Sequence, residues 1–439
     1  MHLCKNRPLS FENKQFLINC NLQNCLKFRD LLKLIANPLS QFFMKNYSIF
    51  KLVLILTPFV FSFAFGLDIY IPIVPEMTKI FDTTPNLIQL TLSLFLLVTG
   101  IGQLFIGPLS DQFGRKKIFY ASSFLFGAGS LICAFSGQIS WLIVARLISA
   151  FGACGMLVNS FALVRDLYVG NEGAKIYSFL NGAIGISPTF APILGGYLNL
   201  YFGWESIFVF LTLIGFCSLL ITKFYIEETH PKDLRVNFDG QVFKRYFNIL
   251  KNRQFLTFAL IAGCAESVFF CFFSISPFMI IDVHGVPSHQ FGYYFASFGS
   301  VIALGGFIGG KITEKQGVQK TIIYGIGLMF LGGCSMLIWH FMNGPSLSGF
   351  LIPMSIACTG AMFLVGGTAS LALQPFASIA GTASAAFGSL EFGIASLTGS
   401  ILMLFPVVSS LPYSLFIIVL SLISLMLFIL DNSKVVNEA

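Results

Sequence analysis

The chain has 439 residues, of which 56% are hydrophobic and only 10% are charged, and its formal net charge is +7. Ordinary soluble domains carry about 25% charged residues, so this composition excludes a water-soluble protein and predicts a chain that crosses a membrane many times. The ten cysteines form no Cys-x-x-Cys pair and no cluster with histidine. We therefore expect the cysteines to act as small apolar side chains and not as metal ligands.

Twelve apolar stretches follow one another along the chain, each close to the 20 residues that span a bilayer as a helix. The expected spans are 52–74, 87–107, 117–137, 140–163, 176–199, 203–224, 255–278, 291–311, 320–341, 347–371, 379–404 and 411–430. Around them we predict an N-terminal extension at 1–50, six-helix bundles at 51–225 and 255–430, a polar linker at 226–254 and a tail at 431–439. Residues 1–43 are either an upstream extension of the reading frame or hold an interfacial helix at 22–36.

Lysine and arginine lie almost wholly on one side of these predicted spans. If the N-terminus is cytoplasmic, the outward loops receive only Lys79. The inward side receives eight basic residues up to Lys51 and the following others: Arg115, Lys116, Lys117, Arg165, Lys175, Lys223, Lys232, Arg235, Lys244, Arg245, Lys251, Arg253, Lys311, Lys315, Lys320 and Lys434. Basic residues collect in cytoplasmic loops. The pattern predicts both termini in the cytoplasm and accounts for the positive charge without a nucleic-acid partner.

The two predicted bundles carry similar stretches at a fixed spacing. GPLSDQFGRKK (107–117) follows the second span, and GKITEKQGVQK (310–320) follows the eighth. A shift of 203 residues lays Asp111 on Glu314 and Gly114 on Gly317. Parallel repeats of six helices are a known plan of transporters. The spacing therefore predicts an all-α membrane protein with two pseudo-symmetric six-helix bundles.

Three stretches resemble signatures of the major facilitator superfamily, and the resemblance covers nearly all of 50–430. GPLSDQFGRKK is similar to the family's loop between spans 2 and 3, with Gln112 where arginine is usual. RLISAFGACG (146–155) and GISPTFAPILGG (185–196) resemble the motifs of spans 4 and 5. DIYIPIVPEM (68–77) and SPFMIIDVHGVPSHQFG (276–292) are similar to the bicyclomycin-resistance (Bcr/CflA) branch of drug:proton antiporters. The resemblance implies two six-helix bundles that alternate in access.

The loop and the span 5 motif both have a structural and a functional interpretation. In the loop, the resemblance assigns a conformational latch to Gly107, Asp111, Gly114, Arg115 and Lys116; the alternative is a simple basic turn in which Asp111 caps a helix N-terminus. In span 5, the motif consists of Gly185, Pro188, Pro192, Gly195 and Gly196. Its prolines predict a kink, and its glycines permit close packing. The span is either a pliable seam between the bundles or a bend that serves packing alone.

Two opposite charges lie inside the first predicted bundle. Asp68 and Arg146 are each six residues from the outer ends of spans 1 and 4, or about 9 Å deep at 1.5 Å per residue. A charged side chain at the centre of a spanning helix costs about 2.5–3.5 kcal/mol, and such residues usually mark a pathway. The shared depth permits a structural bridge, but we favour a functional pair. The resemblance places both residues in the central cavity.

The second predicted bundle contains two carboxylates and no basic residue inside a span. Glu266 lies about 16 Å along span 7 and Glu391 about 18 Å along span 11, so both are near the bilayer midplane. An unpaired carboxylate there tends to hold a proton, which suits a proton carrier or a site for cationic ligands. The alternative is a protonated glutamate that hydrogen-bonds within the bundle. No family role transfers to either position.

These observations predict a proton-coupled exporter of drugs or other small molecules, in a bacterial inner membrane. The expected partners are the lipid bilayer and a small-molecule substrate of lipophilic or cationic character, and we expect a monomer. No cofactor or metal is expected, because the proton gradient supplies the drive. The alternatives are an uptake symporter or a metabolite exporter of the same fold. A membrane enzyme is a further alternative, but the sequence shows no nucleophile–base set that would support it. The sequence also lacks the GxxxxGK[ST] phosphate loop, which argues against direct use of ATP.

Overall fold

The computed structural model describes residues 48–168, 171–230, 240–405 and 409–435. The chain divides into two compact units, 1–51 and 52–439, and the spans lie in the second. The predictions for the N-terminal extension and for parts of the linker and tail fall outside the described residues. The predicted bundle boundaries at 225 and 255 stay predictions.

Every predicted span corresponds to a helix. The helices are α2 (Ile49–Asp68), α3 (Val74–Ile80), α4 (Pro85–Phe113), α5 (Arg115–Ala134), α6 (Ile139–Leu167), α7 (Asn171–Phe202), α8 (Glu205–Phe224), α9 (Gly240–Leu250), α10 (Arg253–Pro277), α11 (Ser288–Gln316), α12 (Val318–Asn343), α13 (Leu347–Leu373), α14 (Ala380–Leu402) and α15 (Leu411–Val435). Eleven helices of the described residues are long and apolar enough to cross a membrane. The twelfth span is α7, a 32-residue helix that is less apolar because of its glycine, proline, serine and asparagine residues.

The first span differs from the single helix predicted at 52–74. α2 ends at Asp68, the 3₁₀ helix η2 (Ile71–Ile73) follows, and α3 begins at Val74. Pro72 and Pro75 follow the break, and neither can donate a backbone hydrogen bond. The span predicted at 52–74 is therefore present within Ile49–Ile80, which is long and apolar enough to cross a membrane, but its helix is interrupted next to the buried Asp68.

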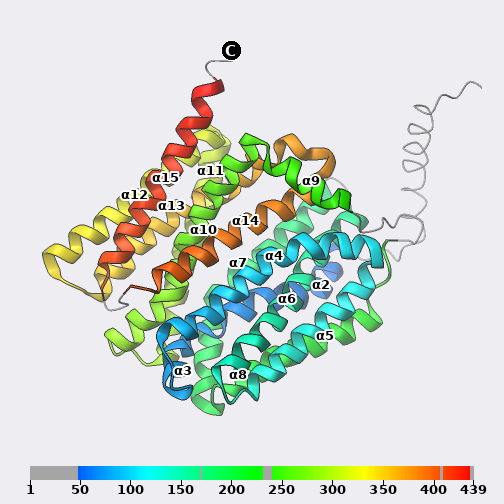
Figure 1. Ribbon diagram of the computed structural model, residues 1–439, viewed down its shortest axis with the longest axis horizontal. Helices are drawn as coiled ribbons and strands as arrows, with labels where there is room; N and C mark the ends of the chain where they lie inside the picture. The colour runs from blue at the N-terminus through cyan, green and yellow to red at the C-terminus, as the bar shows by residue number, and fades with distance from the viewer. Residues whose placement is uncertain (1–47, 169–170, 231–239, 406–408, 436–439) are drawn as a thin grey trace, which may run out of the picture. The chain divides into compact units, whose positions relative to one another are not determined.

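The two halves repeat the same packing pattern. In the first half α5 contacts α6 and α8, and α4 contacts α6; in the second half α12 contacts α13 and α15, and α11 contacts α13 (Figure 1). The loops also repeat, because Gly114 and Gly317 both end a helix at positive φ, at 96° and 86° respectively. Glycine adopts this conformation without steric cost. The prediction of duplicated bundles with Asp111 and Glu314 at equivalent places is confirmed.

Two seams join the halves, one between α4 and α14 and one between α7 and α11. In the first, the Ser396 hydroxyl donates to the carbonyl of Ser93 at 2.7 Å. In the second, the hydroxyls of Tyr197 and Tyr293 lie 2.7 Å apart. The side-chain amide of Gln89 also donates across the halves, to the hydroxyl of Ser274. Uncharged hydrogen bonds therefore hold the halves together at these points.

Candidate functional site

Asp68 is the last residue of α2 and is almost fully buried, with 3% of its surface exposed. The Ser187 hydroxyl of α7 donates to its carboxyl Oδ2 at 2.7 Å. A carboxylate at a helix C-terminus faces the negative end of the helix dipole. Both the burial and the dipole therefore oppose a negative charge at this position.

Arg146 lies inside α6 and is 1% exposed. Its Nη1 donates to the carbonyl of Gly66 at 2.7 Å, and its guanidinium carbon lies 4.5 Å from the ring centre of Phe95 and 5.1 Å from that of Tyr70. Aromatic faces attract a cation within about 6 Å. The Nε and Nη2 groups have no hydrogen-bond partner in the described part of the chain.

The ion pair that the shared depth of Asp68 and Arg146 suggested is not formed. Among the described residues, the only ion pairs within 4 Å are those of Arg115 with Asp111 and with Asp166. Depth fixes one coordinate of a side chain, whereas the direction around the helix axis decides which neighbour it meets. Asp68 points to α7, while Arg146 binds the carbonyl of Gly66, two residues before Asp68. The two groups therefore belong to one region without direct contact.

The two glutamates of the second half lie on helices that pack together, α10 and α14. Between these helices the Thr398 hydroxyl donates to the Ser267 hydroxyl at 2.8 Å. Glu266 and Glu391 are both partly exposed, and they lie close enough for the charge of one to act on the other. Neither is in an ion pair with a basic group of the described chain. The structure thus brings together the two acids that depth alone had placed at one level.

Glu391 also stands next to the contact between the halves. The ring of its neighbour Phe392 stacks on Phe63 of α2 at a centroid distance of 5.6 Å. The Cβ of Phe392 would lie 3.1 Å from a Cβ built on Gly100 of α4. The α14 segment that carries Glu391 therefore packs against both α2 and α4, the helices that carry and flank Asp68.

The span 5 motif touches both halves of the molecule. A Cβ built on Gly195 would lie 1.9 Å from the carbonyl oxygen of Ile69, where the first span breaks. A Cβ on Gly196 would lie 2.9 Å from the Cα of His289 in α11. Gly185 has no such neighbour within 4 Å, and α7 continues through Pro188 and Pro192. Gly195 and Gly196 are thus required for close packing, and Gly185 is not.

The loop motif is organised by Arg115, whose side chain is 2% exposed. Its Nη1 lies 2.7 Å from Asp111 and its Nε 2.7 Å from Asp166 of α6. Asn159 donates to the backbone carbonyl of Arg115 at 2.7 Å. The interpretation of Asp111 as an N-terminal cap was wrong, because Asp111 lies in the last turn of α4. Glu228 of the linker takes that place and accepts from the backbone N–H of Arg115 at 2.9 Å.

Asp166→Asn should lower the stability of the protein by about 2 kcal/mol, between the small value of exposed pairs and the larger value of buried ones. Arg115 would keep only Asp111 as a charged partner, which is 44% exposed, whereas Asp166 is 16% exposed. The measurement is thermal unfolding of the purified protein in detergent. Asp111→Asn is the matched control and should cost less. A larger loss from Asp111→Asn would contradict this assignment.

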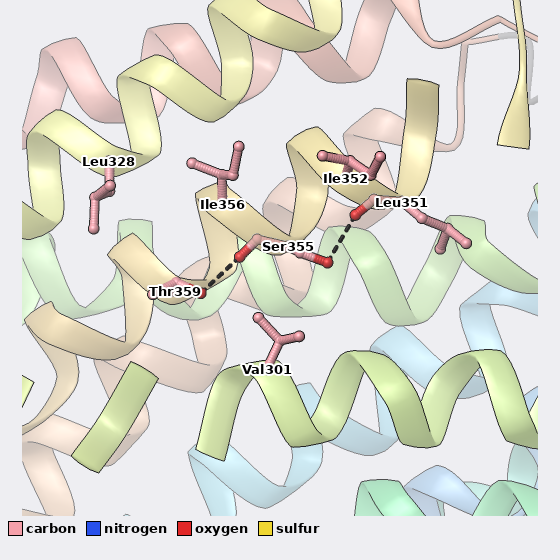
Figure 2. A pocket seen from close by; sticks show the side chains of 7 residues that line it. All are labelled: Val301, Leu328, Leu351, Ile352, Ser355, Ile356 and Thr359. Carbon is pink, nitrogen blue, oxygen red and sulfur yellow. Dashed lines mark hydrogen bonds between the residues drawn. The ribbon is translucent and has the colours of Figure 1, made fainter. Parts of the chain in front are cut away.

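An open groove of about 390 Å³ in the second half holds none of the predicted site residues. Figure 2 shows it between α11, α12 and α13, lined by Val301, Leu328, Leu351, Ile352, Ser355, Ile356 and Thr359. The hydroxyls of Ser355 and Thr359 both donate to carbonyls of their own helix. The hydroxyl protons of the lining are therefore used within α13 and the other lining residues are apolar, so we assign no function to this groove.

Several residues of the site could not be found from the sequence. Ser187, Tyr70 and Phe95 surround the buried charges, but serine and aromatic residues are common throughout the spans. The sequence gave only a weak indication of a role for Asp166, which directly follows Arg165 just beyond a predicted span. Glu228 lies in a polar linker where an acid attracts no notice. Their roles depend on contacts between distant parts of the chain.

Comparison with known proteins gives consistent results. The sequence profile described as Major Facilitator Superfamily matches residues 56–400. The uncharacterized MFS-type transporter YdgK of Bacillus subtilis is 33% identical over 76% of this chain and 83% of its own length. The chloramphenicol resistance protein of Pseudomonas aeruginosa is 30% identical over 79% and 82% respectively. The bicyclomycin resistance protein homolog of Haemophilus influenzae is 29% identical over 77% and 85%.

Solved structures of similar fold are more distant in sequence. A bacterial homolog of the human lysosomal transporter Spinster, in an inward-facing conformation, has a TM-score of 0.66 at 16% identity and covers 88% of this chain and 97% of its own. The xylose transporter XylE from E. coli, in a partially occluded inward-open conformation, has a TM-score of 0.65 at 15% identity over 87% and 97%. At these identities the comparison supports the fold alone.

Proposed function

Because this chain belongs to the Major Facilitator Superfamily, we propose that it exports drug-like small molecules by alternating access of its two halves. It is a multi-pass membrane transporter. The resistance proteins named for chloramphenicol and bicyclomycin match it over more than three quarters of its length. These two compounds are therefore the first substrates to test. An uptake symporter or a metabolite exporter of the same fold is the second candidate, since topology does not fix the direction of transport.

Export is driven by protons in this proposal, and Asp68 carries them. The observation that carries the proposal is a buried carboxyl group at a helix end, which accepts a hydrogen bond from Ser187 and has no ion-pair partner among the described residues. Such surroundings favour the protonated form. Loss of the proton creates a carboxylate in the same region as Arg146, whose Nε and Nη2 have no hydrogen-bond partner among the described residues, and we expect the carboxylate to turn towards Arg146. Protonation of Asp68 would thereby change the contacts between α2, α6 and α7.

The location and the drive follow from the same proposal. The protein works in a bacterial inner membrane as a monomer, with both termini in the cytoplasm as the distribution of lysine and arginine indicates. It uses the proton gradient and no cofactor. The experiment that tests the function is counterflow of chloramphenicol and of bicyclomycin in proteoliposomes, with and without an imposed pH gradient. Accumulation that depends on the gradient supports proton-coupled export, and its absence for both compounds contradicts the proposed substrates.

Glu266 and Glu391 extend the site towards cationic substrates. Two partly exposed carboxylates lie close together with no described base to pair them, and two unpaired charges near the midplane are costly. At least one of the pair therefore holds a proton. A lipophilic cation that enters beside them would displace that proton, and the displacement is itself an exchange of substrate for proton.

Glu266→Gln and Glu391→Gln should each weaken the transport of a lipophilic cation much more than that of a neutral compound of similar size. The two effects should be non-additive, because the side chains share one site. The measurement is transport of both compounds by the single and double variants. Glu314→Gln is the control, since Glu314 lies at the loop end of α11. Equal losses for cationic and neutral compounds would assign the glutamates to packing.

A further inference from the structure

The linker between the halves contains a short helix with an unusual distribution of side chains. α9 has the sequence GQVFKRYFNIL and no acidic residue. One face is buried, with Tyr246 7% exposed and Ile249 fully buried. At 100° per residue, an exposed apolar stripe lies beside this face, formed by Leu250, Phe243 and Phe247. The remaining face is basic.

The buried face attaches α9 to both halves of the protein. The Tyr246 hydroxyl donates to the carbonyl of Leu104 in α4 at 3.0 Å, and the ring of Phe243 meets that of Phe105 at 6.3 Å. Burial and the nearby charge of Asp111 raise the pKa of Tyr246 to about 12, so the hydroxyl keeps its proton and remains a donor. α9 also contacts α14 and α10 of the second half.

The other faces of α9 point away from the protein. Phe247 is 58% exposed and Phe243 51%, while Lys244, Arg245 and Lys251 are all exposed. The ammonium group of Lys251 lies 4.4 Å from the ring centre of Phe247. α9 ends at Leu250 and the spanning helix α10 begins at Arg253, so only Lys251 and Asn252 connect α9 to a helix that is long and apolar enough to cross a membrane. An exposed apolar stripe next to a basic face is typical of helices that lie in the interface of a bilayer.

We propose that α9 binds the anionic lipid headgroups of the cytoplasmic leaflet through Lys244, Arg245 and Lys251, with Phe247 and Leu250 inserted among the acyl chains. Basic residues near an anionic membrane surface each favour binding by about five-fold. Because α9 contacts both α4 and α14, a lipid held there acts on the seam that joins the halves. The lipid composition of the membrane would then influence the balance between conformations.

The test places a tryptophan on the exposed stripe of the full-length protein by the change Phe247→Trp. Vesicles of zwitterionic phosphatidylcholine with a fixed fraction of phosphatidylglycerol are used, and one of the two lipids carries bromine in its acyl chain. Bromine quenches tryptophan fluorescence on contact. The native tryptophans Trp141, Trp204 and Trp339 are present in parent and variant alike, so the difference between them reports the new residue.

The expected result is stronger quenching by brominated phosphatidylglycerol than by brominated phosphatidylcholine at equal fractions, and the excess should fall in 1 M salt, where the screening length is about 3 Å. K244Q/R245Q/K251Q should bring the ratio of the two quenching values to about one. K311Q/K315Q/K320Q removes the same charge elsewhere on the basic side and should leave the ratio unchanged. Equal quenching with α9 intact overturns the lipid preference, and no quenching by either lipid overturns its insertion.

Discussion

Asp68→Asn should abolish uphill transport driven by a pH gradient and leave downhill exchange of the same compound. The carboxyl group is buried at the end of α2 and accepts a hydrogen bond from Ser187. Asparagine has nearly the same size and can still accept that bond, but it cannot release or bind a proton. The measurement is accumulation in proteoliposomes with an imposed gradient, compared with counterflow without one. Accumulation should fall to the level of empty liposomes.

The matched control for this experiment is Asp82→Asn. Asp82 is exposed and has a positive φ of 45°, a conformation that asparagine adopts readily. It should keep full uphill transport. Ser187→Ala is a second test, because it removes the donor without touching the carboxyl group, and it should shift the pH dependence of transport and not eliminate it. Full uphill transport by Asp68→Asn would remove Asp68 from the coupling mechanism.

Gly152→Val should prevent the first half from folding. A Cβ at Gly152 of α6 would lie 2.3 Å from the backbone nitrogen of Phe126 and 2.7 Å from the carbonyl oxygen of Ser122 in α5. Backbone atoms of a packed helix cannot move aside as a flexible side chain can. Overpacking of a core typically costs 1–3 kcal/mol, and the overlap with backbone atoms here should exceed about 3 kcal/mol. The measurement is the yield of monodisperse protein after extraction and its unfolding temperature.

Gly366→Val is the control for this change. Gly366 lies inside α13, is exposed, and has no neighbouring atom within 4 Å of a built Cβ. The same substitution should leave yield and unfolding temperature close to those of the parent. Gly152→Ala should give an intermediate loss, because it adds the clashing atom without the branches. A normal yield of Gly152→Val would mean that α5 and α6 separate at little cost.

The fold could be predicted well from the sequence because a bilayer constrains a chain strongly. The lengths of the apolar stretches located all twelve spans within a few residues. The spacing of 203 residues predicted that Gly114 and Gly317 end their helices alike. Both arguments depend on properties that are local or repeated along the chain. They need no knowledge of which helix lies beside which.

The site was harder to predict, because its contacts depend on which helix lies beside which. The depth of Asp68 and Arg146 followed from counting residues, but their partners depend on the rotation of α2 and α6 about their axes. Glu228 caps α5 from more than a hundred residues away, a contact that local patterns do not encode. A single sequence gives the position of a charge within the bilayer more reliably than the identity of its neighbour.

The uncharged hydrogen bonds between the halves limit the free energy that the proposed proton drive must supply. One proton that crosses a membrane potential of 100 mV delivers about 2.3 kcal/mol. It could not interconvert two conformations whose free energies differ by much more than that. The Ser396 hydroxyl, which holds the carbonyl of Ser93, lies in a helix and can turn instead to a carbonyl of its own preceding turn. Separation of the seam at that point leaves no buried donor without a partner. A salt bridge between the halves at that point would cost far more to break, and the single proton of the proposed mechanism would no longer supply enough free energy to separate them.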